Sequence, residues 1–429
     1  MKVCVYGLWH LGSVTAACLA KAGFETLGLD PDPQTIARLS GGWPPLFEPG
    51  LEALTRDGLA SGKLRFAADP ACVAEADIIW VTFDTPVDEE DRADDGMVAR
   101  AVERLFPHLR DGAVVLISSQ LPVGSTRKLE RAFAVAQGRC VSFACSPENL
   151  RLGKAIEVFT HPERIVVGIR DSHARIVLEP LLARFCETLI WMSVESAEMT
   201  KHALNAFLAT SVTFMNEIAT VCERVGADAA EVEWALRSEP RVGQRAYIRP
   251  GAAFAGGTLA RDVMFLTEIA RQHDLTLPML SGVVPSNKNH RRWPVNQVLA
   301  RLGGLRGRRV AILGLTYKPG TDSLRRSPGV EFCRELVAAG AAVSAHDPAA
   351  EALPADLAAR LTRTETAMAA LEGAEAAVIA TEWPDYRALV PEELLKTMVR
   401  PLILDQGRLL ADRLAGDGRF QYITVGTPL

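Results

Sequence analysis

Two stretches at opposite ends of the chain share one pattern of strand, glycine, helix and acidic turn. Near the start, six residues separate Ala22-Gly23 from Asp30-Pro31, and near the end six residues separate Ala339-Gly340 from Asp347-Pro348. An apolar run that ends in glycine precedes each copy: Val3–Gly7 and Val310–Gly314. Repetition of this kind indicates repeated structural units, with chance similarity of strand and helix punctuation as the competing explanation. The pattern predicts an α/β protein with two Rossmann-like doubly wound parallel-sheet domains.

A long helix is predicted between the two copies. Ser196–Arg224 contains neither proline nor glycine, and Gly226 is a candidate C-terminal cap. About thirty helical residues span about 45 Å, which is more than one domain needs, so this helix is expected to join the two units. The basic stretch Lys288–Pro294 is predicted to be a loop. We expect three domains: a Rossmann-like domain at residues 1–195, a central helical domain at residues 196–300 and a second Rossmann-like domain at residues 301–429.

Composition narrows the class of protein. The 429 residues carry a net charge of −5, so there is no basic excess for binding nucleic acid or an anionic membrane surface. No apolar run approaches the roughly 20 residues that span a bilayer. The eight cysteines show no CxxC pairing. We therefore expect a reduced, cytoplasmic protein without a structural metal.

The first glycine turn has most of a dinucleotide fingerprint. Such a site needs Gly-x-Gly-x-x-Gly between a strand and a helix, followed about 20 residues later by an acidic residue for the ribose. Gly7 and Gly12 take the first and third glycine positions, and Asp30 follows at the expected distance, but Trp9 replaces the middle glycine. The indole must point away from the cofactor or displace it. Asp30 favours NAD over NADP, because a carboxylate repels a 2′-phosphate. The alternative for the whole glycine motif is a packing turn that binds no ligand.

Four longer motifs resemble the UDP-glucose/GDP-mannose dehydrogenase family, and the resemblance runs nearly from end to end. The first is Val14–Ala17, directly after the fingerprint, and the second is the helix segment Ala197–Glu217. The third is the glycine-rich loop Phe254–Asp262, and the fourth is Gly314–Pro328, at the start of the second Rossmann-like unit. Members of the family oxidise the 6-hydroxymethyl group of a nucleotide sugar twice with NAD. The steps run through an aldehyde and a cysteine thioester to a uronate. The resemblance therefore implies an NAD-dependent oxidoreductase that acts on a UDP-sugar or another NDP-sugar.

The resemblance assigns catalytic roles within these motifs. Lys201 and Asn205 are four residues apart, which places both on one face of a helix. By resemblance, Lys201 stabilises the developing oxyanion, and Asn205 holds a water or a substrate oxygen. Asp262 assists proton transfer, and Glu148 is one of two glutamates that support the reaction. A solvated surface position is the ordinary alternative for a lysine.

Several positions depart from the family pattern. Thr258 stands four residues before Asp262, where the family has its nucleophilic cysteine. Gln120 replaces a threonine, Leu152 replaces the second glutamate, and Asp84 replaces a glycine near the cofactor. A free thiol has a pKa near ~8.5 and is readily activated, whereas a threonine hydroxyl needs a strong base. We therefore expect the second oxidation to be the step that suffers most.

The resemblance and the fingerprint together supply the remaining site residues. The cofactor site is predicted to comprise Gly7, Trp9, Leu11, Gly12, Asp30, Thr85 and Gln120. The substrate site is predicted to comprise Arg241, Tyr247, Gly256, Lys318, Arg325 and Arg408. The partners expected are a nucleotide sugar and a second copy of the chain, bound through the long helix.

Alternatives to the complete oxidation remain open. Cys145, three residues before Glu148, could substitute for the missing nucleophile, although a buried structural cysteine is the usual interpretation. The protein could instead perform a single two-electron oxidation, or a redox-neutral epimerisation through bound NAD. It could also be an inactive protein that binds nucleotide sugars.

Overall fold

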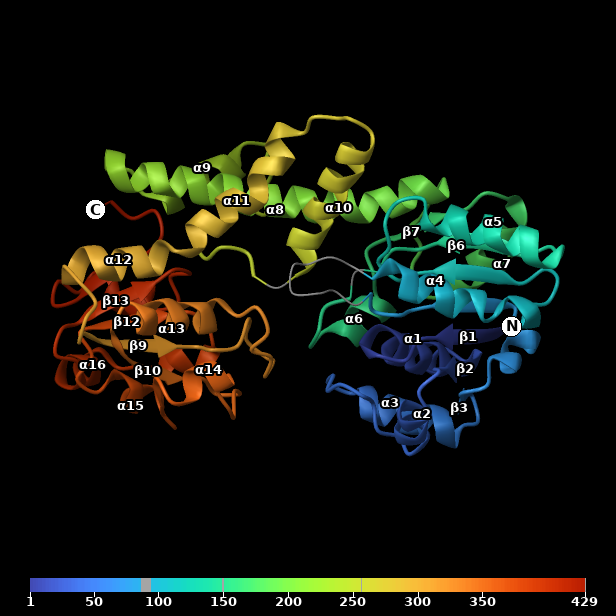
Figure 1. The fold of residues 1–429 in the computed structure, drawn as a ribbon, viewed down its shortest axis with the longest axis horizontal. Coiled ribbons are helices and arrows are strands. Elements are labelled where there is room, and N and C mark those ends of the chain that lie inside the picture. Colours follow the sequence, from blue (N-terminus) through green and yellow to red (C-terminus); the bar gives the residue numbers. More distant parts are fainter. Residues whose placement is uncertain (86–93, 149, 256, 429) are drawn as a thin grey trace. The chain divides into compact units, whose positions relative to one another are not determined.

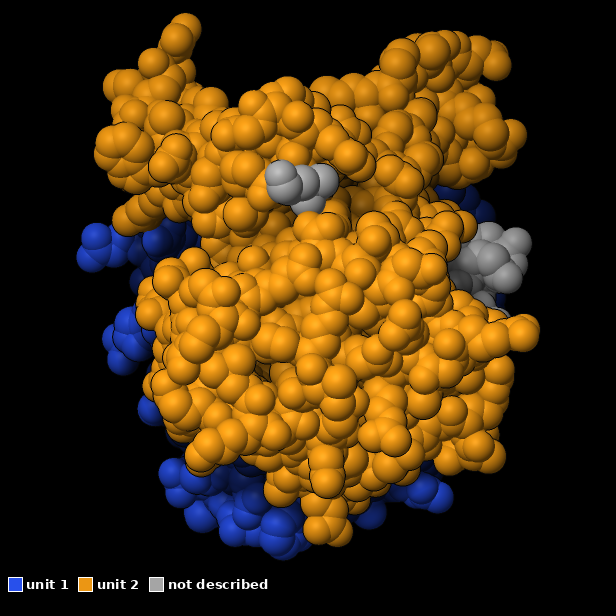
Figure 2. Space-filling model, turned by 90° about the vertical axis from the view of Figure 1, so that its left-hand side faces the viewer, with its two compact units in different colours: residues 1–203 blue, residues 204–429 orange. Residues whose placement is uncertain are grey.

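The structure is a computed structural model that describes residues 1–85, 94–148, 150–255 and 257–428. The chain divides into two compact units, Met1–Ala203 and Leu204–Leu429, which Figure 2 shows in blue and orange. Each unit contains one sheet (Figure 1). Among the described residues, no helix has both the length and the apolar character that crossing a membrane requires.

Unit 1 is built on an eight-stranded sheet of order β3-β2-β1-β4-β5-β6-β7-β8. Its strands are β1 Lys2–Tyr6, β2 Glu25–Leu29, β3 Leu64–Ala67, β4 Ile78–Val81, β5 Val114–Ile117, β6 Ser142–Cys145, β7 Ile165–Gly168 and β8 Leu189–Met192. All neighbouring strands are parallel except β6 and β7, which pair antiparallel. The order and direction of the strands match the predicted doubly wound unit, except that β7 and β8 run antiparallel to the other strands.

Both faces of this sheet are buried. Along β1, Val3 and Val5 pack into one hydrophobic cluster, whereas Cys4 and Tyr6 pack into the cluster on the opposite face. Continuous apolar strands are typical of a parallel sheet covered by helices on both sides. The helices of unit 1 are α1 His10–Lys21, α2 Pro33–Ser40, α3 Leu51–Ala60, α4 Asp95–Glu103, α5 Ser125–Gln137, α6 Ala155–Thr160 and α7 Ser172–Leu182.

The predicted connecting helix is present. Helix α8 runs over 32 residues, Val194–Val225, from unit 1 into unit 2, and Gly226 follows it with a positive φ of 80° (Figure 1). The predicted loop at Lys288–Pro294 is wrong, because α11 (Pro278–Arg291) and α12 (Trp293–Leu302) occupy most of it. Pro294 lies in the first turn of α12, where a backbone N–H group has no helical partner, so the proline removes no hydrogen bond from the helix.

Unit 2 contains a six-stranded parallel sheet of order β11-β10-β9-β12-β13-β14. Its strands are β9 Arg309–Leu313, β10 Ala342–His346, β11 Thr362–Arg363, β12 Ala376–Ile379, β13 Leu402–Asp405 and β14 Gln421–Ile423. Its remaining helices are α9 Ala229–Ser238, α10 Thr258–Gln272, α13 Pro328–Ala338, α14 Ala355–Ala358, α15 Ala367–Leu371, α16 Pro391–Thr397 and α17 Ala411–Leu414. The fold class predicted from the repeat is thereby confirmed.

The glycines of the repeat have equivalent roles in the two units. Gly7 and Gly314 follow β1 and β9 with positive φ angles of 96° and 101°. A Cβ atom on Gly12, in the first turn of α1, would lie 1.8 Å from the carbonyl oxygen of Gly7. A Cβ atom on Gly329, in the first turn of α13, would lie 2.2 Å from the carbonyl oxygen of Gly314. In each unit, glycine lets the helix pack directly against the end of the strand.

The repeated Asp-Pro pair also has an equivalent structural role. The Oδ2 atom of Asp30 accepts a hydrogen bond of 2.7 Å from the backbone N–H of Leu8, the residue after the first glycine. The Oδ2 atom of Asp347 accepts one of 2.6 Å from the N–H of Leu315, and another from Thr316. Each aspartate therefore stabilises the glycine turn of its own unit.

Candidate active site

The glycine turn of unit 1 is shaped to receive a pyrophosphate. Trp9 is the N-terminal cap residue of α1, and its side chain makes no capping hydrogen bond, so it leaves the first amides of the helix available. Amides at a helix N-terminus bind phosphate groups. The Trp9 side chain is 49% exposed, so it is not packed into the turn. The residues present therefore fit a dinucleotide, despite the missing middle glycine.

Asp30 lies where a ribose carboxylate is expected. It follows β2, and its Oδ1 atom accepts a hydrogen bond of 3.0 Å from the N–H of Asp32. Because a carboxylate has about four acceptor positions, its two backbone hydrogen bonds leave capacity for a ribose hydroxyl. Asp347 differs, since it is buried and accepts hydrogen bonds from five donors of unit 2 in addition to Leu315. Of the two repeated aspartates, Asp30 is the one suited to a ligand.

Other predicted cofactor residues lie on the loops after β4 and β5. The Thr85 hydroxyl donates a hydrogen bond of 2.6 Å to the backbone oxygen of Gln120, so the structure brings these two residues together. Leu11 is buried in α1. Asp84, which replaces a family glycine, is exposed.

Lys201 and Glu148 come together within unit 1. The Nζ atom of Lys201 donates a hydrogen bond of 2.6 Å to the backbone oxygen of Glu148 and lies 3.8 Å from its Oε1 atom. The Lys201 side chain is only 12% exposed, so the solvated surface position does not apply. A small cavity of about 20 Å³ is lined by both residues together with Gln120 and Cys145. It is large enough for about one water molecule.

Cys145 lines this cavity but is poorly suited to act as a nucleophile. Burial, with a smaller contribution from the charge of Glu198, raises the pKa of its thiol well above the ordinary value of 9.0. The thiol is therefore protonated near neutral pH, and the thiolate is the reactive form.

The catalytic residues predicted in unit 2 form a buried pair. The side-chain amide of Asn205 donates a hydrogen bond to the Oδ2 atom of Asp262. Both residues are buried, and Asp262 is completely so. Thr258 is the first residue of α10, one turn before Asp262, and it is exposed. Gly256 lies outside the described residues.

The predicted substrate residues of unit 2 occupy different environments. Arg241 forms an ion pair of 2.8 Å with Glu239 and is largely exposed, and Tyr247 is also exposed. The Lys318 ammonium lies 5.5 Å from the centre of the Tyr317 ring, a cation–π geometry. Arg325 is exposed.

Arg408 is the predicted substrate residue with the most constrained backbone. Its φ angle is 60°, in the left-handed region, and its guanidinium forms an ion pair of 2.7 Å with Asp228. It follows the C-terminal end of β13, the sheet edge at which open α/β sheets bind ligands.

Sequence reasoning missed two residues beside Arg408. The Arg249 guanidinium donates a hydrogen bond to the backbone oxygen of Gly407 and lies 3.9 Å from Glu382 Oε2. Burial raises the pKa of Glu382 above its ordinary value. A Cβ atom on Gly407 would lie 1.6 Å from Glu382 Oε1, so a larger residue there would require the Glu382 carboxylate to move. The run Asp405–Arg408, whose resemblance to a family motif is the reason for choosing Arg408, indicated the loop, but nothing in the local sequence of Glu382 could have indicated this contact.

A third missed residue is Glu48 of unit 1. Its buried carboxylate accepts hydrogen bonds of 2.8 Å from the N–H groups of Gly153 and Ala155, and lies 2.9 Å from His10 Nε2. It thereby ties the segment after Glu148 to the first turn of α1. In the part of the chain that the structure describes, no group of three or more His, Cys, Asp or Glu side chains is placed to hold a metal ion.

A glycine turn suited to a pyrophosphate lies in one unit, and a second doubly wound sheet lies in the other; these are the features of an α/β protein that binds a dinucleotide. Three stretches of the chain match domains of one family, described as the UDP-glucose/GDP-mannose dehydrogenase family. They are its NAD binding domain at residues 1–186, its central domain at 195–289 and its UDP binding domain at 311–412. The chain belongs to this family, and its cofactor is NAD.

Individual relatives agree with this assignment. The chain is 34% identical over 445 residues to a UDP-glucose 6-dehydrogenase of Pseudomonas aeruginosa, with 100% of this chain and 98% of the relative covered. It is 34% identical over 439 residues to a UDP-glucose 6-dehydrogenase of Rhizobium meliloti, with both chains fully covered. The solved structure of a UDP-glucose dehydrogenase from Pyrobaculum islandicum is 35% identical, covers 91% of each chain and has a TM-score of 0.84. The resemblance seen in the motifs is thereby confirmed at the level of the family.

Proposed function

We propose that this dehydrogenase oxidises the C6 hydroxymethyl group of UDP-glucose or of a closely related nucleoside-diphosphate sugar. The match to the UDP binding domain and the named activities of the relatives support this substrate class. The observation that carries the proposal is the placement of Lys201, whose ammonium is nearly buried and held at the backbone of Glu148. A positive charge fixed in this way can stabilise an alkoxide as the alcohol is oxidised.

We assign the other roles by chemistry. NAD supplies the hydride acceptor when it is bound. Lys201 and Asn205, one turn apart on α8, are both assigned to the reacting oxygen, and Asp262, which accepts a hydrogen bond from Asn205, is assigned to the uptake of the hydroxyl proton. The first oxidation is balanced: the C6–H bond breaks with loss of a hydride, the proton leaves the oxygen, and an aldehyde remains.

We further propose that oxidation stops after this first step. Thr258 stands in place of the thiol that would trap the aldehyde, and Cys145 is buried with a raised pKa. Leu152 replaces the second glutamate, which weakens control of the hydrolytic water, and Gln120 replaces a family threonine. Acid and base assistance is worth roughly 10²–10⁴-fold, so losing these groups slows the second oxidation far below the first.

The number of NADH molecules formed per sugar tests both the proposed oxidation at C6 and its proposed arrest after the first step. Purified protein is mixed in single turnover with UDP-glucose and NAD, and NADH and the sugar product are quantified. One NADH with an aldehyde supports the proposal, and Thr258→Ala should behave almost as the unaltered protein. Two NADH with a uronate would show complete oxidation. An isomer without NADH, or no reaction with a panel of nucleotide sugars, would refute oxidation altogether.

We also propose a cytoplasmic homodimer formed through α8. Phe207, Phe214 and Val221 repeat every seven residues along this helix and are 66%, 48% and 56% exposed. Such a repeat forms one apolar stripe, which a second copy can cover. Light scattering should report a dimer, and Phe207→Ser with Phe214→Ser should yield monomers.

We further propose that the NAD-binding domain ends at residue 195, that the central helical domain ends at residue 300, and that the nucleotide-sugar-binding domain follows.

A further inference from the structure

A buried carboxylate near the start of α8 caps a different helix. Glu198 is 5% exposed, and its Oε2 atom accepts a hydrogen bond of 2.6 Å from the N–H of Gly124. Its Oε1 atom accepts bonds of 2.9 Å and 2.7 Å from the N–H and hydroxyl of Thr126. Gly124 is the N-terminal cap residue of α5 and has no side chain with which to cap it. Glu198 thus supplies the missing cap, where a negative charge is favoured by the helix dipole.

Glu198 lies on the same face of α8 as Lys201. The two residues are three positions apart, and both line the 20 Å³ cavity together with His202. The Nε2 atom of His202 lies 2.9 Å from the backbone oxygen of Leu121. The first three turns of α8 are therefore bonded at two points to the segment between β5 and α5. That segment also contains Gln120, whose backbone oxygen accepts the hydrogen bond from Thr85.

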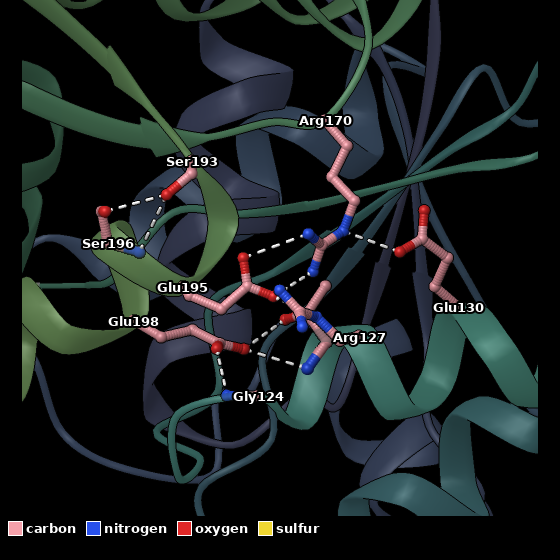
Figure 3. Close-up of polar contacts among 9 residues, drawn as sticks. Gly124, Arg127, Glu130, Arg170, Ser193, Glu195, Ser196 and Glu198 are labelled. Atoms are coloured by element: carbon pink, nitrogen blue, oxygen red, sulfur yellow. Dashed lines mark hydrogen bonds and ion pairs between the residues drawn. The ribbon is translucent and has the colours of Figure 1, made fainter.

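Glu195, one turn earlier, is held in a different way. Figure 3 shows its carboxylate facing Arg127 and Arg170, whereas Glu198 faces the backbone at Gly124. Hydrogen bonding from Arg170, aided by Arg127, lowers the pKa of Glu195 to about 2. These partners are long, partly exposed side chains that can move with the helix. The partners of Glu198 include two backbone amides, which fix its position much more tightly.

We propose that Glu198 is a positioning residue for the dehydrogenase reaction. By binding the amides at the N-terminus of α5, it sets the rotation and the axial position of the first turns of α8. It thereby holds the Lys201 ammonium at the backbone oxygen of Glu148. This inference rests on the proposed role of Lys201. An error of about 1 Å in placing a catalytic group can cost ~10²-fold in rate, so the contact has a kinetic consequence.

The test measures kcat, KM for UDP-glucose and the affinity for NAD in the full-length protein. In Glu198→Gln, the amide NH₂ replaces an acceptor and faces an N–H donor. We expect kcat to fall roughly 10–100-fold, with KM and NAD affinity changed less than about threefold. With substrate deuterated at C6, the isotope effect on kcat should rise, because hydride transfer becomes rate-limiting. A merely structural role would reduce the amount of folded protein and leave kcat and the isotope effect per folded molecule unchanged.

Milder variants keep the test decisive if Glu198→Gln fails to fold. Thr126→Val removes one of the three donors at nearly constant volume, and Thr126→Ser retains it. We expect kcat to fall several-fold in the first and to stay within about twofold in the second. Glu195→Gln is the matched control on the same helix turn and should also stay within about twofold.

Lys201→Ala, measured beside these variants, separates the inference from the proposed function. If Lys201→Ala retains full turnover, the proposed role of Lys201 fails, and the inference fails with it. If Lys201→Ala is inactive while Glu198→Gln and Thr126→Val retain kcat, only the inference is overturned. Equal losses in Glu195→Gln and Glu198→Gln would also overturn it.

Discussion

Truncating Lys201 to alanine should abolish turnover while leaving the fold and the nucleotide affinities intact. The Nζ atom donates a hydrogen bond of 2.6 Å to the backbone oxygen of Glu148, and a hydrogen bond from a charged group contributes about 1.5–3 kcal/mol to stability. The 3.8 Å contact with the partly exposed Glu148 carboxylate adds ~0–1 kcal/mol. For a unit of about 200 residues, a total of about 1.5–4 kcal/mol corresponds to a decrease in Tm of about 3–16 °C.

The catalytic loss should be seen in folded protein, because kcat is measured well below the lowered Tm. Removing a fixed group that stabilises a developing oxyanion costs roughly 10²–10³-fold in kcat, or about 3–4 kcal/mol. The assay follows NADH at 340 nm with UDP-glucose, while calorimetry gives Tm and titration gives the NAD affinity. Lys128→Ala, an exposed lysine of α5, is the control and should have unchanged kcat. If Lys201→Ala retained more than about a fifth of kcat, the assignment of Lys201 to the reacting oxygen would be refuted.

Three further predictions concern the cofactor site and the pH dependence of stability. Gly12→Ala should lose NAD binding in titrations, because its Cβ would lie 1.8 Å from the backbone oxygen of Gly7. Gly282→Ala is the control and should bind NAD normally, because its Cβ meets nothing within 4 Å. The unaltered protein should bind NAD more tightly than NADP, and Asp30→Ala should reduce that preference; equal binding of both cofactors by the unaltered protein would contradict the ribose argument. Burial raises the pKa of Glu223 above its ordinary 4.5, so the folded state binds this proton more tightly than the unfolded chain, and stability should fall as pH rises from 4.5 through the raised pKa. Glu223→Gln should remove this component from denaturation curves measured between pH 4 and 8, and an unchanged pH profile would argue against it.

The fold was largely predictable because its signals are local. Gly7 and Gly314 end apolar strands, and the absence of proline and glycine between Ser196 and Arg224 predicted α8 almost to its ends. These signals depend on backbone conformation within a few residues. The one misjudged segment, Lys288–Pro294, is rich in charge and contains proline, but it belongs to two helices whose apolar side chains pack in unit 2.

Part of the candidate site was also determined by the sequence alone. Lys201 and Asn205 share a helix face because they are four residues apart, whatever the rest of the chain does. Asp30 follows the second strand of a Rossmann-like unit, and the absence of a thiol at Thr258 is a fact of the sequence.

Tertiary structure decided which charged groups are held in place and which are solvated. Glu198 binds amides 74 and 72 residues away, Glu48 binds amides 105 and 107 residues away, and Glu382 meets Arg249 across more than a hundred positions. Glutamate is ordinarily a surface residue, so its type gives no indication of burial. Only folding brings these carboxylates to the amides and guanidinium that offset their desolvation. The sequence therefore determined the two sheets, the helix that joins them and the missing thiol, whereas long-range packing determined what fixes Lys201 in position.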